Sequence, residues 1–448
     1  MLLLAGNRRE STPNASLSPL TRLKLDCTNH QKIGKIPLTT TLVPEPPAPS
    51  SLPFLGLAPF LRQSIAGTDL GPISQELVAL AQQNPEDADQ WMNLAIAMFS
   101  LHQRDIGLSI QNEALALRRV YHLPAKQQPA RCKLLMLLAP GDLSVNTPLE
   151  CLLEDSDIDL VFYYVAADSL FPAPIPEHDA LIVCVGENDD NQPILAALDS
   201  ALTGWPKPVI NRPHHLLQVE RAAASELLQN IPGLLMPPTL QIARADLEAV
   251  ANGTSTLAEK IAGSAFPIIL RPLGSHAGHD LERIASPLEI GTYLAQVDAA
   301  DFFIAPFIDY SGPDGLFRKF RVALIDGQPY ACHMAVSSHW MVHYVNAGMY
   351  EDAGKRAEEL AFMVNFADFA KRHAVALAAI HQRSQLEYLC LDCAETTDGQ
   401  LLIFEIDHAM VVHAMDSEEM FPYKQQHMLK VKEAFRDFLC RLIPETAR

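Results

Sequence analysis

Apolar residues follow a helical period in the segment after residue 70. Ile73, Leu77 and Leu80 recur at spacings of three and four residues, and the same spacing resumes at Trp91 through two further helices. Such spacing gives each helix one apolar stripe that can pack against a neighbour. The pattern therefore predicts a helical segment over residues 71–125.

The first 70 residues lack this period. They include the stretch Val-Pro-Glu-Pro-Pro-Ala-Pro-Ser-Ser at 43–51, which is too rich in proline to join a packed element. We therefore expect residues 1–70 to form a disordered, Pro-rich leader.

Continuous apolar runs replace the helical period between residues 131 and 205. Three of them, at 133–138, 158–165 and 180–185, alternate with helical segments. Strands of this kind are buried on both faces, which is typical of a small parallel sheet. Ligands of such sheets lie beyond the carboxyl ends of the strands. The segments at those ends carry no dinucleotide fingerprint, so we do not expect NAD.

A longer α/β region, residues 206–448, fills the rest of the chain. It contains a short strand that ends at Arg271 and runs into a Gly/Ser-rich loop, and a strand that holds the charge of Arg321. A long, largely apolar helix is predicted over residues 355–381, and an amphipathic helix over residues 424–442. The chain is thus expected to be an α/β protein of several domains.

Two apolar runs near the end of the chain predict a β-hairpin. They cover residues 389–394 and 401–407 and are joined by a segment that contains Asp398-Gly399, a strong two-residue turn signal. If these two residues are the turn, Thr397 faces Gln400 and Asp392 lies opposite Glu405, with Cβ atoms ~5 Å apart. The opposite, apolar face would then hold a set of core residues: Leu389, Leu391, Cys393, Leu402, Phe404 and Ile406.

This register gathers three acids, Asp392, Glu405 and Asp407, on one face. Carboxylates so close repel one another unless one is protonated or a cation lies between them. Mg²⁺ prefers one or two protein carboxylates and completes its shell with water and phosphate oxygens. The alternative is a solvated face whose acids point at water or at basic side chains.

Composition narrows the class of partner. The chain has 448 residues, 48% of them hydrophobic and 19% charged, which is ordinary for a globular protein. A net charge of −19 argues against a nucleic-acid or anionic-membrane partner. With scattered cysteines, no signal peptide and no run of transmembrane length, we expect a soluble cytoplasmic protein with reduced thiols.

Two further motifs are weak indications of a redox or zinc site. Cys390 and Cys393 form a C-x-x-C, but inside a predicted strand they point to opposite faces, so a redox pair is not expected. His339 and His343 have the spacing of helical zinc ligands. Without a glutamate between them or a third ligand nearby, solvated histidines are the better interpretation.

The order of these features resembles the ATP-grasp superfamily, nearest to its branch of glutathione synthetase and RimK-like peptide ligases. The shared order is strand-end cation, Gly/Ser loop, apolar hinge strand, strand arginine, long helix and acidic hairpin, over roughly Pro206 to Pro444. The parallel sheet at 131–205 resembles the domain that precedes such modules. Residues 88–119 resemble one tetratricopeptide repeat (TPR). That segment would be a partner-binding or dimerisation hairpin, or a helical cap on the next domain.

The resemblance implies a site for ATP and Mg²⁺ or Mn²⁺. Arg271 and Arg221 stand at the family's two nucleotide lysines, and Asp309 lies near its ribose-binding acid. Arg321 matches a cation that supports the transferred phosphoryl group, Asn346 an asparagine near the phosphates, and His333 replaces a phosphate-side arginine. The remaining positions implied are the phosphate loop (Gly274, Ser275, Gly278), the adenine hinge (Phe307, Ile308) and the metal ligands (Asp392, Glu405, Asp407).

The function implied is an ATP-dependent carboxylate–amine ligase. A small-molecule or peptide carboxylate would be phosphorylated, and an amine would then displace phosphate. Two alternatives stay open: a nucleotide-binding interaction protein without catalysis, and a phosphotransferase that uses the same ATP site with a hydroxyl acceptor. The sequence departs from the family pattern at its Arg-for-Lys positions and at His408-Ala409-Met410, which follows the hairpin in place of a Gly-containing segment.

Overall fold

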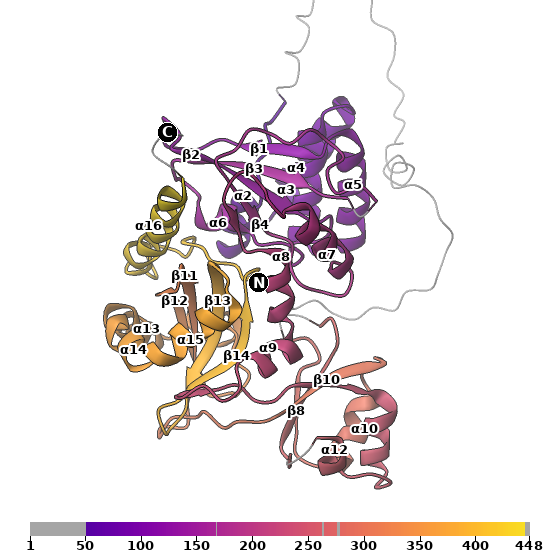
Figure 1. Cartoon of the computed structure of the whole chain (residues 1–448), viewed down its shortest axis with the longest axis vertical. Helices are drawn as coiled ribbons and strands as arrows, with labels where there is room; N and C mark the ends of the chain where they lie inside the picture. The colour runs from indigo at the N-terminus through magenta and orange to yellow at the C-terminus, as the bar shows by residue number, and fades with distance from the viewer. Residues whose placement is uncertain (1–50, 167, 262–263, 276–277, 444–448) are drawn as a thin grey trace, which may run out of the picture. The chain divides into compact units, whose positions relative to one another are not determined.

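The computed structural model describes residues 51–166, 168–261, 264–275 and 278–443. These residues belong to two compact units that divide between Arg119 and Val120. We call residues 51–119 the helical unit and residues 120–443 the α/β unit, and describe each by itself (Figure 1).

The helical unit confirms the three predicted helices, and it adds one. Its elements are α2 (Ala58–Ile65), α3 (Gly71–Gln83), α4 (Ala88–Ser100) and α5 (Arg104–Leu117). Gly107 allows α4 and α5 to approach closely, because a Cβ there would lie 2.5 Å from the ring of Phe99. Whether this pair is a TPR stays a prediction.

The predicted leader is too long. The proline-rich stretch up to residue 50 lies outside the described residues, but residues 51–70 are packed rather than disordered. Phe54, Leu57 and Phe60 are buried. The Asn93 side chain accepts a hydrogen bond from Leu55 N (2.8 Å) and donates one to the carbonyl of Pro53 (2.9 Å). A few large apolar residues without helical spacing are enough to fix this segment, which is why the pattern missed it.

The first sheet of the α/β unit is the predicted parallel one. Its order is β1-β3-β2-β4-β5, with β2, β3, β4 and β5 parallel and β1 antiparallel at one edge. Its strands are β1 (Val120–Leu123), β2 (Cys132–Leu138), β3 (Ile158–Tyr164), β4 (Ala180–Val183) and β5 (Val209–Ile210). Helices α6 (Leu149–Leu152) and α7 (Gln192–Ala201) lie in its connections. Strands β3 and β4 lie on opposite sides of β2, so the order in which the strands are added to the sheet reverses between β2 and β4. Ligands of such sheets bind at this point.

A small antiparallel sheet follows, in the order β7-β10-β8-β9. It contains β7 (Leu240–Ala243), β8 (Ile268–Pro272), β9 (Glu282–Ile284) and β10 (Asp301–Pro306). Helices α10 (Arg244–Ala251), α11 (Leu257–Lys260) and α12 (Pro287–Leu294) share a separate apolar core with it. Figure 1 shows α10 and α12 together beside these strands.

The third sheet carries the acidic hairpin. Its order is β12-β11-β13-β14-β6, antiparallel except for the pairing of β14 with β6. Its strands are β6 (Leu234–Leu235), β11 (Phe317–Ile325), β12 (Gln328–Ser337), β13 (Tyr388–Glu395) and β14 (Leu401–Asp407). The elements α8 (Pro213–Leu216), η1 (Leu217–Val219) and α9 (Arg221–Leu227) precede it, and η2 (Tyr344–Asn346) follows β12.

The helix predicted over residues 355–381 is wrong as a single, buried element. Three helices replace it: α13 (Ala353–Val364), α14 (Phe366–Arg372) and α15 (Ala374–Ser384). They divide at Asn365 and His373, and the Asn365 side chain donates to the carbonyl of Ala361 (2.9 Å), an interaction that competes with helix continuation. Their outer faces are open, with Val364 and Val375 exposed. The final helix, α16 (Lys424–Leu442), lies where it was predicted.

The hairpin confirms the pairing of Asp392 with Glu405, although its turn is different. The loop has three residues, because Thr396 N donates to Gln400 O and Glu395 pairs with Leu401. A β-bulge then restores the register, since Asp392 pairs with Glu405 but the next residue, Cys393, pairs with Ile403. The bulge reverses the faces before it. Leu402 and Phe404 therefore pack on the acidic face, not among the predicted core residues.

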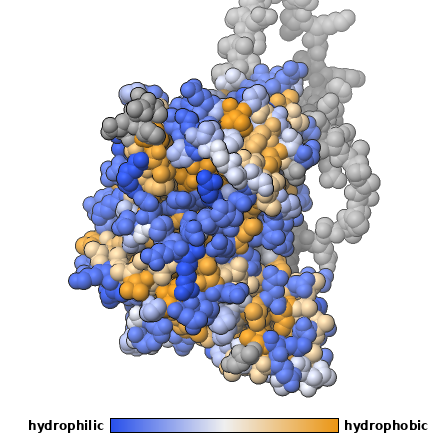
Figure 2. Space-filling view, in the orientation of Figure 1, coloured by the Kyte–Doolittle hydropathy of each residue, from blue (hydrophilic) through white to orange (hydrophobic). Residues whose placement is uncertain are grey.

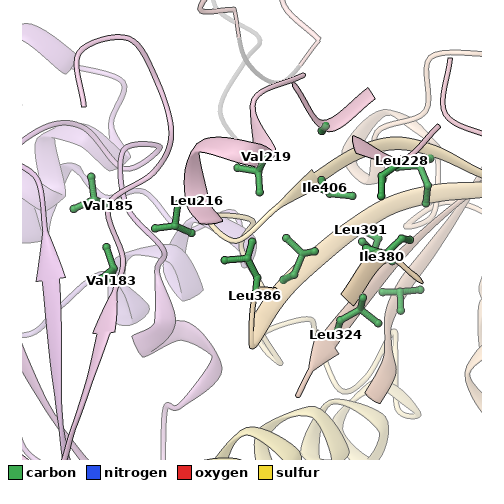
Figure 3. Close-up of a cluster of buried hydrophobic side chains, with 14 of the residues drawn as sticks. Val183, Val185, Leu216, Val219, Leu228, Leu324, Ile380, Leu386, Leu391 and Ile406 are labelled. Atoms are coloured by element: carbon green, nitrogen blue, oxygen red, sulfur yellow. The ribbon is translucent and has the colours of Figure 1, made fainter. Parts of the chain in front are cut away.

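One apolar core runs through the first and third sheets. It contains Val183 and Val185 at the end of β4, and Leu391 and Ile406 of the hairpin. Figure 3 shows Leu216 and Val219 between these two groups. The core therefore places the carboxyl end of β4 beside the end of β14.

Candidate functional site: a charged row across the third sheet

Four charged or titratable side chains form a row across adjacent strands. His333 of β12 pairs with Arg321 of β11, Arg321 with Asp392 of β13, and Asp392 with Glu405 of β14. Partners in antiparallel strands point to the same face, so these residues share one side of the sheet. Helices α14 and α15 pack on the other side, against the main core. We call these four residues the charged row.

Asp392 is the centre of the row and is fully engaged by two cations. Arg321 donates from Nε to Oδ1 (2.8 Å) and from Nη2 to Oδ2 (3.0 Å), and Lys319 Nζ lies 2.7 Å from Oδ2. Burial alone would raise the pKa of Asp392. The charges of Arg321 and Lys319 outweigh it and hold that pKa well below its usual range. Asp392 is therefore an anion at neutral pH.

Glu405 and Asp407 continue the acidic face on β14. Glu405 forms an ion pair with Arg221, the first residue of α9. Asp407 accepts a hydrogen bond from Ala409 N (2.9 Å), and burial together with the charge of Glu405 raises the pKa of Asp407 to about 6. These two carboxylates thus repel each other, which a bound cation would relieve.

The three predicted metal ligands are not gathered into one centre. Among the described residues, no group of three His, Cys, Asp or Glu side chains is placed to hold a metal ion. Both oxygens of Asp392 already contact Arg321 or Lys319. Glu405 keeps Oε2 outside its ion pair with Arg221, and Mg²⁺ needs only one or two protein carboxylates, so Glu405 and Asp407 fit a divalent cation better. The metal site, and Asp392 in it above all, stays a prediction.

Arg221 and Arg271 lie close enough to interact electrostatically, and the charge of Glu405 acts on Arg271 as well. Arg271, at the end of β8, is buried and donates from Nε to Ser275 Oγ (3.2 Å). Burial and then the charge of Arg221 lower the pKa of Arg271 to about 10. Because like charges held together in a partly buried place favour an anion between them, this pair fits a phosphate group.

Two glycines of the predicted phosphate loop have a left-handed backbone. Gly274 and Gly278 have φ values of +69° and +74°, a region that favours glycine. A Cβ at Gly278 would lie 2.5 Å from Nε2 of His343. The loop therefore lies directly against the segment that follows β12.

The predicted hinge is only partly available to a base. Phe307 N donates to the carbonyl of Pro267 (3.1 Å), so this N–H is already used. The Phe307 ring lies 4.6 Å from the guanidinium of Arg283 and contacts Trp340 edge-on, with ring centroids 5.7 Å apart. Asp309 is exposed, and hydrogen bonds from Ser311 lower the pKa of Asp309, which keeps an anionic acceptor at the place predicted for a ribose hydroxyl.

The three residues predicted to assist phosphoryl transfer, Arg321, His333 and Asn346, lie in different environments. Arg321 is buried and donates to Asp392 and to the carbonyl of Val411 (3.1 Å), so it orients Asp392 rather than facing a substrate. Burial, followed by the charge of Arg321, lowers the pKa of His333 well below its usual value. A neutral imidazole does not supply the predicted phosphate-side cation. Asn346 is exposed in η2, and its Oδ1 accepts from His343 N (3.0 Å).

Lys319 and His343 are site residues that sequence reasoning missed. Lys319 shares a face with Arg321 two residues later on β11, a signal that the two-residue strand period could have given. The sequence suggests His343 only as a zinc ligand. Burial and then the charge of Lys319 lower the pKa of His343 to about 4, so this ring is neutral between the phosphate loop and the charged row. No sequence pattern predicts that His343 lies beside the phosphate loop.

Comparisons with known proteins give similarity of structure only. No protein-family model and no curated protein sequence matches the chain. A RimK-domain ATP-grasp protein from Sphaerobacter thermophilus matches with a TM-score of 0.39 and 14% identity, over 68% of this chain and 99% of that one. The VanG D-Ala:D-Ser ligase from Enterococcus faecalis gives 0.42 and 10%, over 69% and 98%.

D-alanine–D-alanine ligase from Bacillus anthracis, solved in complex with ATP, gives a TM-score of 0.40 and 12% identity, over 67% of this chain and 98% of that one. At these TM-scores the likeness does not assign the chain to a family. In the part of the chain that the structure describes, no helix is long and apolar enough to cross a membrane.

Proposed function

We propose that the chain is an ATP-dependent ligase of the ATP-grasp type, which joins a carboxylate to an amine through an acyl phosphate. The observation that carries the proposal is the meeting of Arg221 and Arg271 beside the acids of β14. A polyphosphate and a divalent cation are the ligands that such a mixed arrangement of charge accommodates.

On the phosphate side, the two arginines have distinct tasks. Arg271 is fixed by Ser275 and presents a buried cation at the strand end, where it would bind phosphate oxygens. Arg221 is held by Glu405 and would add a second cation. Gly274 and Gly278 would allow the loop backbone to approach the phosphates. Asp309 would accept a hydrogen bond from the ribose.

On the acidic side, Glu405 and Asp407 are the residues that would hold Mg²⁺ or Mn²⁺. When bound, the cation would neutralise negative charge on the phosphates. Arg321 and Lys319 would keep Asp392 ionised and fixed in orientation. Lys319 is the member of this pair with some exposure, at 16% of its side chain, so it is the one placed to reach a transferred phosphoryl group.

The chemistry would proceed in two displacements. An oxygen of the substrate carboxylate attacks the γ-phosphorus of ATP, and the bond to ADP breaks to give an acyl phosphate. The nitrogen of an amine then attacks the acyl carbon, and inorganic phosphate leaves as the amide forms. The amine nitrogen loses its proton to the departing phosphate or to solvent, since the lowered pKa of His343, about 4, makes that ring a weak proton acceptor.

One observation favours a second candidate, a protein that binds the nucleotide without turnover. Both oxygens of Asp392 are committed to Arg321 and Lys319, which leaves this acid less able to serve the chemistry than a free carboxylate. The two candidates share the nucleotide site and differ in product. Release of ADP that depends on both a carboxylic acid and an amine supports the ligase.

The test combines binding with turnover. A non-hydrolysable ATP analogue is titrated into the protein with and without Mg²⁺, and ADP release is followed across a panel of acids and amines. The variant Arg271→Ala should weaken analogue binding at least tenfold. The exposed Lys371→Ala on α14 is the control for a lost positive charge and should change nothing. Binding that is unaffected by Arg271→Ala would refute the proposed site.

A further inference from the structure

A group of hydrogen-bond acceptors lies where the end of β4 meets the end of β14. It consists of Glu187 after β4, Glu220 before α9, and Asp407 and His408 at and after the end of β14. We call these four residues the acceptor cluster. His408 joins its two sides, because its Nε2 lies 3.0 Å from the carbonyl of Val185. A Cβ at Gly186 would lie 3.7 Å from Cβ of Ala409, so the two segments are in contact.

The tautomer of His408 follows from its one hydrogen bond. A carbonyl accepts only, so Nε2 carries the proton and donates to Val185. Nδ1 is then an acceptor. His408 is fully buried, and among the described residues its Nδ1 has no hydrogen-bond partner. The nearest acid, Asp407, places Oδ1 3.6 Å from that nitrogen, so two acceptors face each other.

Glu220 also has a buried acceptor atom without a hydrogen-bond donor among the described residues. Its Oε2 accepts from Ala223 N (2.8 Å) and caps α9, whereas its buried Oε1 has no partner within the described residues. The charge of Glu220 acts on Glu187, as do those of Asp189 and Asp407. Buried polar atoms in folded proteins are almost always hydrogen-bonded. In this cluster two buried acceptors, Glu220 Oε1 and His408 Nδ1, therefore lack donors among the described residues.

The cation next to the cluster in sequence, Arg221, forms its ion pair with Glu405. The charges of Arg221 and Arg321 act on Asp407. Gln192 donates from Nε2 to Glu187 Oε1 (3.2 Å) and is the one neutral donor found at that carboxylate among the described side chains. What the cluster fits is a ligand that brings several N–H donors and a positive charge.

We infer that the acceptor cluster binds the ammonium group of a primary amine that carries no carboxylate next to its nitrogen. This inference rests on the proposed function, because the amine would be the second substrate of the ligase. An ammonium group has three donors and no acceptor, which complements Glu187, Glu220, Asp407 and His408. A neighbouring carboxylate would meet these acids and be repelled. Terminal alkyl amines and diamines are thus favoured over α-amino acids.

The position suits such a substrate. The cluster lies beyond the carboxyl ends of a parallel sheet, next to the place between β2 and β4 where the order of strand addition reverses. Asp407 belongs both to this cluster and to the acidic face of β14. An amine held there would be near the residues proposed to bind ATP.

The test is calorimetric titration of the full chain with 1,4-diaminobutane, with 1,4-butanediol and glycine as comparison ligands. The diamine should bind, and the neutral diol and glycine should bind at least tenfold more weakly. Glu187→Gln and Glu220→Gln remove charge but keep shape, and in the second variant the amide oxygen could still cap α9. Each should weaken diamine binding at least tenfold. Asp190→Asn removes an exposed acid from the same loop and should change affinity less than twofold.

Three results would overturn the inference: no diamine binding, equal binding of the diol, or equal losses in Glu187→Gln and Asp190→Asn. Binding of Mg²⁺ that Glu187→Gln abolishes, with no diamine binding, would also overturn it and make this a metal site. The same samples are titrated with the non-hydrolysable ATP analogue. Diamine binding without analogue binding refutes the ligase and leaves the amine site, and the reverse result refutes only the amine site.

Discussion

Asp392 is the residue whose replacement most sharply tests the charged row. It is 3% exposed and holds two cations, one of which, Arg321, is 4% exposed. The variant Asp392→Asn would leave the Arg321 guanidinium buried without a counter-charge. Removing one partner of a buried ion pair costs about 3–5 kcal/mol. Asp392→Asn should therefore destabilise the α/β unit strongly, in addition to any effect on nucleotide binding.

Lys319→Met provides a graded comparison. Asp392 would keep both hydrogen bonds from Arg321 and lose only the contact of 2.7 Å with Lys319. A hydrogen bond to a charged group contributes about 1.5–3 kcal/mol, so the loss should be smaller than in Asp392→Asn. Asp398→Asn, in the exposed turn of the same hairpin, is the control for a changed carboxylate.

Urea unfolding measures these differences. The background variant Trp91→Phe leaves Trp205 and Trp340, so that fluorescence reports on the α/β unit alone. With a urea m-value of about 3 kcal/mol/M, a loss of ~3–5 kcal/mol moves the midpoint down by about 1–1.7 M. A shift for Asp392→Asn no larger than that for Asp398→Asn would refute the reasoning.

Three further predictions follow from local geometry. Gly278→Ala should weaken nucleotide binding and should destabilise the protein more than Gly399→Ala. Both glycines have positive φ, but only at Gly278 would the new Cβ collide with a side chain. Thermal melts compare the stability of the two variants, and titration with the ATP analogue compares their nucleotide binding. Gly107→Ala should destabilise the helical unit by about 1–3 kcal/mol through its clash with Phe99, measured by circular dichroism. Burial raises the pKa of Glu187 from 4.5 to about 7, so the fold loses stability as the pH rises between these two values, and the loss is complete above about pH 7. Glu187→Gln should therefore stabilise by about 1 kcal/mol at pH 8 and have little effect at pH 4.5, and an equal effect at both would contradict this prediction.

The surface offers no comparable test of a protein partner. Figure 2 shows hydrophobic residues on the visible face as patches among hydrophilic ones. The most exposed large apolar side chains in the described part of the chain, Leu288, Val375 and Val364, come from three different helices. The partner or dimer interface expected for the helical segment thus stays a prediction.

The parallel sheet and the hairpin could be predicted from the sequence, because buried strands appear as continuous apolar runs that depend on local residues alone. The pairing of Asp392 with Glu405 was right even though the turn was wrong, since the extra loop residue and the bulge at Phe404 compensate. A bulge has no sequence signal of its own here. The sequence therefore predicts the wrong face of the sheet for Leu402.

The site was harder to predict than the fold. Arg271, Glu405 and Asp407 could be proposed because strand ends and the hairpin register define their places. The roles of Lys319 and His343 depend on contacts between segments far apart in the sequence, which periodicity does not encode. The same holds for Asp392, whose two cations determine what it can bind.

The most direct test of the central claim is the titration of the wild-type protein and of Arg271→Ala with the non-hydrolysable ATP analogue in the presence of Mg²⁺. The account predicts that the wild type binds, that affinity falls at least tenfold in the variant, and that removal of Mg²⁺ weakens wild-type binding. Absence of binding by the folded wild-type protein, or equal affinity in both proteins, would contradict it.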